Sequence, residues 1–334
     1  MSTEDTDGDE AFEAEQIRQL IDAADPGSHD GFYAIYTMYA ETDAINAVAN
    51  VCRAERDPTT GVKWSTALAT NDGLCSIWAS PQGNLWVGSV WGNVWTTANV
   101  PWGPSDIPSR FKAIPSDPSF TWKGARIPDN AAGHDFNVAA IWCSSDQDVY
   151  FGTFEGPILH WDGATFRVVH AENRRPIVRM HGTSAKDIWA VGRDGVVLHS
   201  DGKGFRALPL PGDAGRGRTL TGVCAISPNE VYICSTAGEI YHGNQHGLEL
   251  LGEYPQSFYG IVQFEKRLIL ACAKTGPCEL KGNRIENLRD TFRCVGVYEL
   301  RRGRVGFVEP SQKPPRVIVY EPARSDRPWA GWGT

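Results

Sequence analysis

The chain contains two adjacent copies of one pattern, in which four short apolar runs alternate with turn residues. The first copy begins at Val138 and the second at Ile177. Corresponding positions include Ile141 and Met180, Val149 and Ile188, and His160 and His199. Weaker copies precede and follow these two at a spacing of about 40 residues, so the pattern is an internal repeat. A repeat constrains the fold strongly, because every copy must form the same structural unit.

Repeats of about 40 residues with four strands each are typical of a β-propeller, in which four-stranded sheets, the blades, surround a central axis. A degenerate copy begins the series, with apolar runs from Phe32 to Met38 and from Ala44 to Ala54. Six clear copies follow, and they centre on Ile77, Ile141, Met180, Val223, Ile261 and Val297. We therefore expect an all-β fold of seven four-stranded blades, which forms one domain over residues 28–334.

The strands of a blade are named A to D from the axis outward. In an up-and-down sheet the A–B and C–D turns lie on one face of the ring. The B–C and D–A loops lie on the other face, which we call the loop face. For the third blade the pattern predicts strands at Val138–Cys143, Val149–Thr153, Ile158–Trp161 and Phe166–Val169. The run from Val317 to Tyr320 predicts a last strand that completes a sheet near the N-terminus, so that the ring has no free edge.

The segment before the repeats has a different composition. Residues 1–10 are acidic, and we expect them to be disordered. From Ala11 to Ala24 the apolar residues recur at helical spacing, and Pro26 and Gly27 follow. This pattern predicts a short amphipathic helix that packs on the propeller rather than recruiting a partner. Residues 1–27 are therefore expected to form an acidic tail and a helix outside the propeller domain.

The second clear copy contains an insertion. The spacing from Ile77 to Ile141 exceeds the period, and the extra residues, at about 97–136, are rich in Pro and aromatic residues. Long loops in compact domains are commonly functional, and exposed aromatic side chains mark an interface. Trp102 and Trp122 are therefore candidate partner-binding residues. The alternative is that the aromatic side chains fold back over the edge of the propeller.

Composition excludes several classes of partner. The net charge is −8, from 32 basic and 40 acidic residues, and seven of the acidic residues lie within the first 15. The remainder of the chain is close to neutral, which gives no general electrostatic footprint for nucleic acid. No apolar run reaches the ~18 residues of a membrane span. The N-terminus lacks the apolar core of a signal peptide, so we expect a cytoplasmic protein.

The repeated polar residues have structural explanations. The three His that end a C strand are His160, His199 and His242, and the three carboxylates before a B strand are Asp148, Asp187 and Glu230. Because the copies lie in different blades, neither set can converge on a metal or form an acid–base pair. We expect the His to form structural hydrogen bonds and the carboxylates to accept backbone N–H bonds of the A–B turns. The eight Cys form no Cys-x-x-Cys pair and are interpreted as buried free thiols. We predict no metal and no cofactor.

One copy carries a recognisable motif. It runs Asp187-Ile188-Trp189-Ala190-Val191-Gly192 and continues from Gly195 through His199 to Asp201-Gly202. This string resembles a repeat of bacterial β-propellers, D-[IV]-W-x-V-G followed by G-x-[IV]-x-H-x-D-G, whose looser relatives are WD-repeat, Kelch-like and photosystem-assembly-type propellers. The chain lacks the Gly-His and Trp-Asp signature of WD repeats and the Ser-x-Asp-x-Gly-x-x-Trp box of sialidases. The resemblance implies a propeller that binds partners, and it carries over no catalytic residues.

Propellers usually bind at the mouth of the channel on the loop face, so the candidate partner-binding residues come from these loops. The B–C loops supply Trp91, Phe154, Glu155, Arg193, Asp194, Lys274 and Glu309. The D–A loops supply Arg175, Arg218, Phe258 and Tyr259. A mixture of Arg and aromatic side chains is typical of protein-binding hot spots.

We therefore predict a non-enzymatic scaffold that binds another protein, is monomeric on its own and binds neither nucleic acid nor membrane. A bacterial adaptor and a toxin-neutralising immunity protein both fit, and the sequence does not separate them. The alternative is a carbohydrate-binding or carbohydrate-active propeller that uses Glu155, Asp194 and Glu309, for which two carboxylates at about 5–10 Å are needed. Nucleic-acid binding is disfavoured because the Arg clusters near residues 174 and 301 fall on opposite faces.

Overall fold

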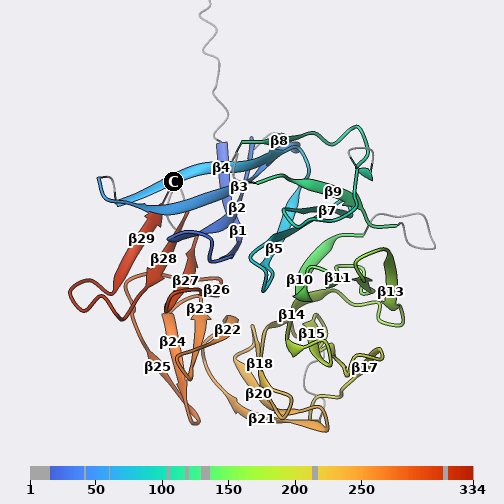
Figure 1. Ribbon diagram of the computed structural model, residues 1–334. Helices are drawn as coiled ribbons and strands as arrows, with labels where there is room; N and C mark the ends of the chain where they lie inside the picture. Colours follow the sequence, from blue (N-terminus) through green and yellow to red (C-terminus); the bar gives the residue numbers. More distant parts are fainter. Residues whose placement is uncertain are drawn as a thin grey trace, which may run out of the picture.

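The computed structural model describes residues 16–40, 43–59, 61–103, 106–116, 120–128, 136–212, 217–310 and 315–333, so the acidic residues 1–10 lie outside it. The described residues form seven antiparallel sheets that surround a central axis in the order of the sequence (Figure 1). The predicted all-β propeller of seven four-stranded blades is confirmed. Among these residues, no helix is long and apolar enough to cross a membrane.

Each blade is a meander whose first strand lies innermost. Blades 1 and 2 contain β1 (Gln16–Ala24), β2 (Gly31–Ala40), β3 (Asp43–Asp57) and β4 (Gly61–Thr70), then β5 (Leu74–Ala79), β6 (Leu85–Ser89), β7 (Asn93–Thr96) and β9 (Lys123–Arg126). Blades 3 and 4 contain β10 (Val138–Ser145), β11 (Asp148–Thr153), β12 (Ile158–Trp161) and β13 (Phe166–His170), then β14 (Ile177–Ser184), β15 (Asp187–Gly192), β16 (Val197–Ser200) and β17 (Phe205–Ala207). The strands predicted for the third blade therefore agree with the observed ones to within two residues.

The last three blades repeat this arrangement. Blade 5 contains β18 (Leu220–Ser227), β19 (Glu230–Ser235), β20 (Glu239–Asn244) and β21 (Gly247–Glu253). Blade 6 contains β22 (Phe258–Phe264), β23 (Arg267–Cys272), β24 (Gly276–Lys281) and β25 (Arg284–Asn287). Blade 7 contains β26 (Val297–Leu300), β27 (Arg304–Glu309), β28 (Arg316–Tyr320) and β29 (Trp329–Gly333).

Apolar packing between blades forms the core. Among the described residues, seven apolar clusters occupy the seven interfaces between neighbouring blades. Every residue of the B strands β6, β15 and β27 is buried, whereas every residue of the outer strands β13 and β17 is half-buried or exposed. Because both faces of a sheet meet a neighbouring blade, the buried strands read as continuous apolar runs rather than as alternating ones.

A glycine repeats near the end of the B strand because the next blade comes very close to it. A Cβ atom on Gly88 would lie 2.5 Å from the Val138 side chain, and one on Gly152 would lie 2.5 Å from the Ile177 side chain. Val138 and Ile177 begin the inner strands of the following blades. Any larger residue at these glycines would therefore push two blades apart.

The predicted N-terminal helix is wrong for the described residues, because Gln16–Ala24 form β1, the innermost strand of blade 1. β1 pairs antiparallel with β2 and has a bulge between Leu20 and Asp22. Leu20, Asp22 and Ala23 are all buried, since β1 also contacts blades 2 and 7. Burial on several sides hides the two-residue alternation of a strand, and tertiary pairing overrides a local spacing that fits a helix. Residues 11–15 lie outside the described ranges.

The two ends of the chain meet without sharing a sheet. The predicted last strand is present as β28, but it pairs with β27 and β29 in blade 7 and not with blade 1. Blade 1 is built from β1 to β4 with β8, all from the first part of the chain. Across the junction, the rings of Phe32 and Trp332 pack with centroids 5.2 Å apart. Ring closure therefore depends on side-chain packing and not on the shared strand that we expected.

A buried arginine connects blade 7 to blade 1 at this junction. Arg304, at the start of β27, is 1% exposed, and its guanidinium donates to Asp25 (3.2 Å), Asp30 (2.8 Å) and the carbonyl of Gly31 (3.2 Å). Asp25 is buried too and accepts the backbone N–H of Arg301 at 2.8 Å. These three acceptors belong to the A–B turn and the adjoining strand of blade 1, and the Nε of Arg304 donates to the carbonyl of Arg301 in blade 7 at 3.1 Å. One side chain therefore aligns the first and last blades.

The insertion between β7 and β9 folds back over the propeller edge. Its strand β8 (Ala113–Pro115) pairs with β4 and extends blade 1 to five strands. Trp102 packs on Trp86 and Trp161, with ring centroids 5.6 and 5.0 Å apart. Trp122 is buried and donates its indole N–H to a carbonyl of β4 at 3.1 Å. For these two tryptophans, the alternative of packing against the propeller is confirmed. Residues 104–105 and 117–119 of the insertion, and residues 129–135 after β9, lie outside the described ranges.

The repeated His and carboxylates pair within each blade. His160 bonds to Asp148 at 2.7 Å and His199 to Asp187 at 3.0 Å, which confirms the structural role predicted for these two His. Asp187 also accepts from the side chains of Thr183 (2.6 Å) and Trp189 (2.9 Å). The carboxylates therefore bond to side chains of their own blade, whereas we expected the backbone N–H groups of the turn. In blade 5 the same pair, His242 and Glu230, is looser, at 3.8 Å.

We expect Arg304→Ala to lower the free energy of unfolding by about 3–5 kcal/mol, because it leaves the buried Asp25 carboxylate without its counter-charge. Urea unfolding followed by tryptophan fluorescence measures this loss. Arg327→Ala, which removes an exposed arginine near the outer strand of the same blade, is the control and should change the value by less than about 0.5 kcal/mol. A loss below 1 kcal/mol for Arg304→Ala would contradict its role in ring closure.

Candidate functional site

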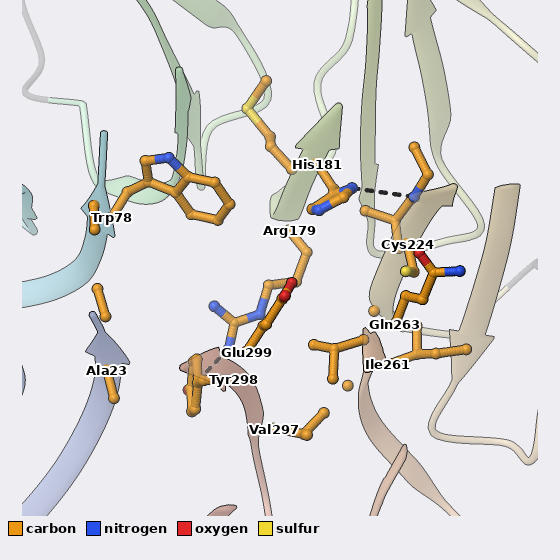
Figure 2. Close-up of a pocket in the computed structure, with 18 of the residues that line it drawn as sticks. Ala23, Trp78, Arg179, His181, Cys224, Ile261, Gln263, Val297, Tyr298 and Glu299 are labelled. Atoms are coloured by element: carbon orange, nitrogen blue, oxygen red, sulfur yellow. Dashed lines mark hydrogen bonds between the residues drawn. The ribbon is translucent and has the colours of Figure 1, made fainter. Parts of the chain in front are cut away.

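The inner strands enclose a cavity of about 420 Å³ along the axis (Figure 2). Its lining comes from β1, β5, β14, β18, β22 and β26, and from the turn that holds Arg301. A second cavity shares Trp78, His181 and Arg301 with the first and extends along β10. Since Arg301 lies in the A–B turn of blade 7, the channel is hollow toward the face opposite the loop face. This channel is one candidate site.

Arg179 crosses the channel wall and is already engaged. Its guanidinium lies 3.5 Å from the carboxylate of Asp22, donates to the hydroxyl of Tyr298 at 3.2 Å and sits 5.6 Å from the centre of that ring. The buried Asp22 also accepts the backbone N–H groups of Ala23 (3.1 Å) and Ile77 (3.0 Å). This network joins β1, β5, β14 and β26. The network holds four blades together. Because the Arg179 guanidinium is already engaged in it, Arg179 has little capacity to bind a ligand anion.

His181 is held neutral in the channel. Burial lowers the pKa of His181 to about 4, and its Nδ1 accepts the backbone N–H of Ala225 at 3.1 Å. The proton of the neutral imidazole is therefore on Nε2. The ring also meets Trp78 edge to face, with centroids 6.4 Å apart. His181 thus joins β14 to β18, and it remains uncharged across the physiological pH range.

The other ionisable groups of the channel do not supply a nucleophile. Burial raises the pKa of Cys224 to about 12, so its thiol is protonated at neutral pH, and a reactive thiolate needs the opposite shift. Burial also raises the pKa of the Glu299 carboxyl. Within the ranges that the structure describes, no group of three or more His, Cys, Asp or Glu side chains is arranged to hold a metal ion. The channel can therefore offer hydrogen bonds to water or a small polar ligand.

The second candidate lies on the loop face of blades 2 to 4. Trp91 and Phe154 follow the B strands of blades 2 and 3, and they are 46% and 41% exposed. Arg110 lies over the Trp91 ring at 5.8 Å, and Arg193 lies over the Phe154 ring at 4.8 Å. Arg175, from the loop between blades 3 and 4, is exposed beside them. We call these five residues the aromatic–arginine surface.

Backbone hydrogen bonds hold the loops of this surface together. The N–H of Phe154 donates to the carbonyl of Asn137 at 2.9 Å, and the N–H of Arg193 donates to Pro176 at 3.0 Å. Asn137 in turn donates its N–H to the carboxylate of Glu155 at 3.0 Å. Each bond joins the B–C loop of a blade to the segment that enters the same blade, so the loops that carry the aromatic rings are held in place.

The structure brings together only some of the predicted partner-binding residues. Trp91, Phe154, Arg175 and Arg193 meet on the aromatic–arginine surface, and Glu155 and Asp194 lie beside them, with Asp194 3.9 Å from Arg175. The other predicted residues do not join this surface. Phe258, Trp122 and Glu309 are buried, and Tyr259 is half-buried. Trp102 packs on Trp161, Arg218 is paired with Glu239, and Lys274 is exposed on the distant blade 6.

Burial explains why several candidates cannot reach a partner. Phe258 is the first residue of the inner strand β22 and belongs to the core between blades 5 and 6. Glu309 ends β27 and pairs with Arg316 of the neighbouring strand at 2.7 Å. In the sequence both residues adjoin loops, but each belongs to a strand whose side chains face a neighbouring blade. Arg110 was missed, because it comes from the insertion and only the fold brings it over Trp91.

Comparison with known proteins identifies the fold. No protein-family model matches the chain, and no curated protein matches it in sequence. Solved structures match in shape: YCF48 bound to D1 peptide has a TM-score of 0.55 at 10% identity and covers 84% of each chain. The WD40 β-propeller domain of Doa1 has a TM-score of 0.60 at 9% identity, over 88% of this chain and 90% of that one. The computationally designed Ika8 protein has a TM-score of 0.56 at 12% identity, over 90% and 83%.

This chain is a seven-bladed β-propeller. At such low identities the likeness shows the fold alone, and one of the matching structures is a WD40 propeller domain. The propeller's function must therefore be argued from its own surface and channel.

We expect His181→Gln to reduce the loss of unfolding free energy that the wild type shows as the pH falls below 6.5. The pKa of His181 is about 4 in the folded chain and 6.5 in the unfolded one, so the unfolded chain binds more protons between these values. Stability from this residue is therefore complete above pH 6.5 and is lost as the pH falls toward 4. Urea unfolding at pH 7 and pH 5 should show a smaller difference for His181→Gln than for the wild type.

The control for this experiment is His246→Gln, which removes an exposed histidine from the C–D turn of blade 5. This variant should keep the wild-type difference between the two pH values. Parallel profiles for His181→Gln and the wild type would mean that the pKa of His181 is the same in the folded and unfolded chains, which would contradict its burial as a neutral imidazole.

Proposed function

We propose that the propeller is a non-enzymatic scaffold that binds another protein through the aromatic–arginine surface. The observation that carries this proposal is the pair of rings Trp91 and Phe154, exposed by more than two fifths on neighbouring blades and each covered by a guanidinium. Exposed apolar groups that cluster on one face mark interaction sites. Tryptophan and arginine are also the residues most enriched among binding hot spots.

The contrast with the channel supports the same choice. Arg179 of the channel wall is already bonded to Asp22 and Tyr298. On the loop face, Trp91 and Phe154 keep their rings accessible although the backbone that carries them is braced. A preformed surface of this kind loses little conformational entropy on binding. A peptide segment or a protein loop is the class of partner that such a surface fits.

The likeness in shape is compatible with this function. One structure of similar shape is YCF48 bound to D1 peptide, and another is a WD40 domain. We extend to this propeller only the class of ligand, a polypeptide. A bacterial adaptor and an immunity protein that neutralises a toxin are two forms of the proposed function, and the identity of the captured partner separates them.

No observation favours the carbohydrate alternative. Of its three carboxylates, Glu309 is buried in an ion pair, Glu155 accepts a backbone N–H, and Asp194 lies beside Arg175. A glycosidase needs two carboxylates that face one sugar ring, with one of them free to donate a proton. No observation favours a continuous basic surface for nucleic acid either. Arg304 is buried, and Arg301 lies on the face opposite the loop face.

We expect Phe154→Ser and Arg193→Glu each to weaken partner binding by at least about tenfold, because each removes half of one exposed ring–guanidinium pair. The purified propeller serves as bait in a native extract, and the amount of each captured protein is measured by quantitative mass spectrometry. Thermal unfolding checks that the variants remain folded, which we expect because both side chains are exposed.

Two control variants make this test specific. Val168→Ser removes an exposed apolar side chain from the outer strand of blade 3, and Lys274→Glu reverses a charge on the loop face of blade 6. Both should capture the partner as the wild type does. If all four variants capture it equally, or if the wild type captures nothing at any salt concentration, the proposed surface is wrong.

A further inference from the structure

The chain enters the propeller on the loop face. β1 is an A strand, and its first residue Gln16 lies opposite Ala40 at the end of β2. The connection that follows Ala40 is the B–C loop of blade 1. The residues before Gln16 therefore leave β1 from the same face of the ring that carries Trp91, Phe154 and Arg193.

The fifteen residues that precede β1 have an extreme composition. They contain no Lys or Arg, one aromatic residue, Phe12, and seven carboxylates, which are Glu4, Asp5, Asp7, Asp9, Glu10, Glu13 and Glu15. Fifteen residues reach up to about 50 Å when extended, which is enough to cross one face of a domain of this size. The segment is thus long enough to reach blades 2 to 4 from its attachment at β1.

The aromatic–arginine surface is complementary to this segment. Three guanidinium groups, those of Arg110, Arg175 and Arg193, stand beside two exposed rings. Two carboxylates offset part of that charge: Asp194 lies 3.9 Å from Arg175, and Glu155 follows Phe154 in the same loop. A single exposed ion pair contributes little, so several carboxylates and an aromatic contact must act together. The segment offers both.

We propose that residues 1–15 occupy the aromatic–arginine surface of their own propeller, and that a partner binds by displacing them. The inference rests on the proposed function for the identity of the surface. It adds the chemistry of the partner, which must itself present a carboxylate-rich segment with an aromatic side chain. Because the segment is tethered, its effective concentration is in the millimolar range, so weak contacts suffice to hold it. Raising the ionic strength weakens them, since the charges are exposed.

The test uses a fluorescein-labelled synthetic peptide with the sequence of residues 1–15 and two forms of the full chain. In one form the seven carboxylates before β1 are replaced by amides, and the other form is the wild type. At low salt we expect fluorescence polarisation to show that the peptide binds the neutralised chain at least about tenfold more tightly, because its site is vacant. In the neutralised chain, Arg193→Glu should abolish this binding and Lys274→Glu should preserve it.

Three results would overturn the inference. They are equal binding of the peptide to both chains, no binding to either chain at low salt, and binding that survives Arg193→Glu. Sedimentation of the wild type tests whether residues 1–15 bind a second copy of the chain instead of their own propeller. A dimer that dissociates when the carboxylates are neutralised would show this and would also overturn the inference. The proposed function is tested separately by partner capture. If Phe154→Ser loses the partner but the peptide binds neither chain, the proposed function holds and only this further inference is wrong.

Discussion

Every blade of this protein is apolar on both faces, and this constraint determines the architecture. A sheet with two apolar faces needs a neighbour on each side, and a linear stack would leave an apolar face exposed at either end. A ring leaves none. Gly88 and Gly152 allow blades 2 and 3 to approach the blades that follow them, and large residues such as Trp86 and Trp189 fill the space between blades. Once the ring is closed, the loops of all blades gather on two faces.

The closing interface differs from the others because it joins residues from opposite ends of the chain. Arg304 reaches Asp25 and Asp30 only when blade 7 stands in register beside blade 1. Replacing a buried ion pair by apolar residues is often neutral for stability, but leaving one partner alone is costly. The ion pair of Arg304 with Asp25 therefore raises the free energy of a misaligned or open ring more than it lowers the free energy of the closed ring. Packing of Phe32 on Trp332 supplies the apolar part of the same interface.

The closed ring separates two kinds of polar chemistry. Inside the channel, Asp22 and Arg179 bond to each other and to neighbouring inner strands, so these charges brace the blades. On the loop face, Arg193 lies over Phe154 from the next blade and both remain accessible. The distance between such groups is set by the packing of the blades and not by the loops themselves. This is why a surface suited to a partner can be rigid although it is made of loop residues.

The sequence by itself determined the repeat, the blade number and the strands of the central blades, because inter-blade burial imposes the same pattern on every copy. Only the tertiary structure decided the rest. The helix expected over the residues of β1 was wrong because its apolar side chains are buried against β5 and β26, which are distant in sequence, and the local spacing does not show those contacts. The fate of each aromatic residue was also decided in three dimensions, because Trp91 is exposed while Trp102 and Phe258 are covered by neighbouring strands. Burial depends on what lies opposite a side chain, and a repeat does not specify that for its irregular parts.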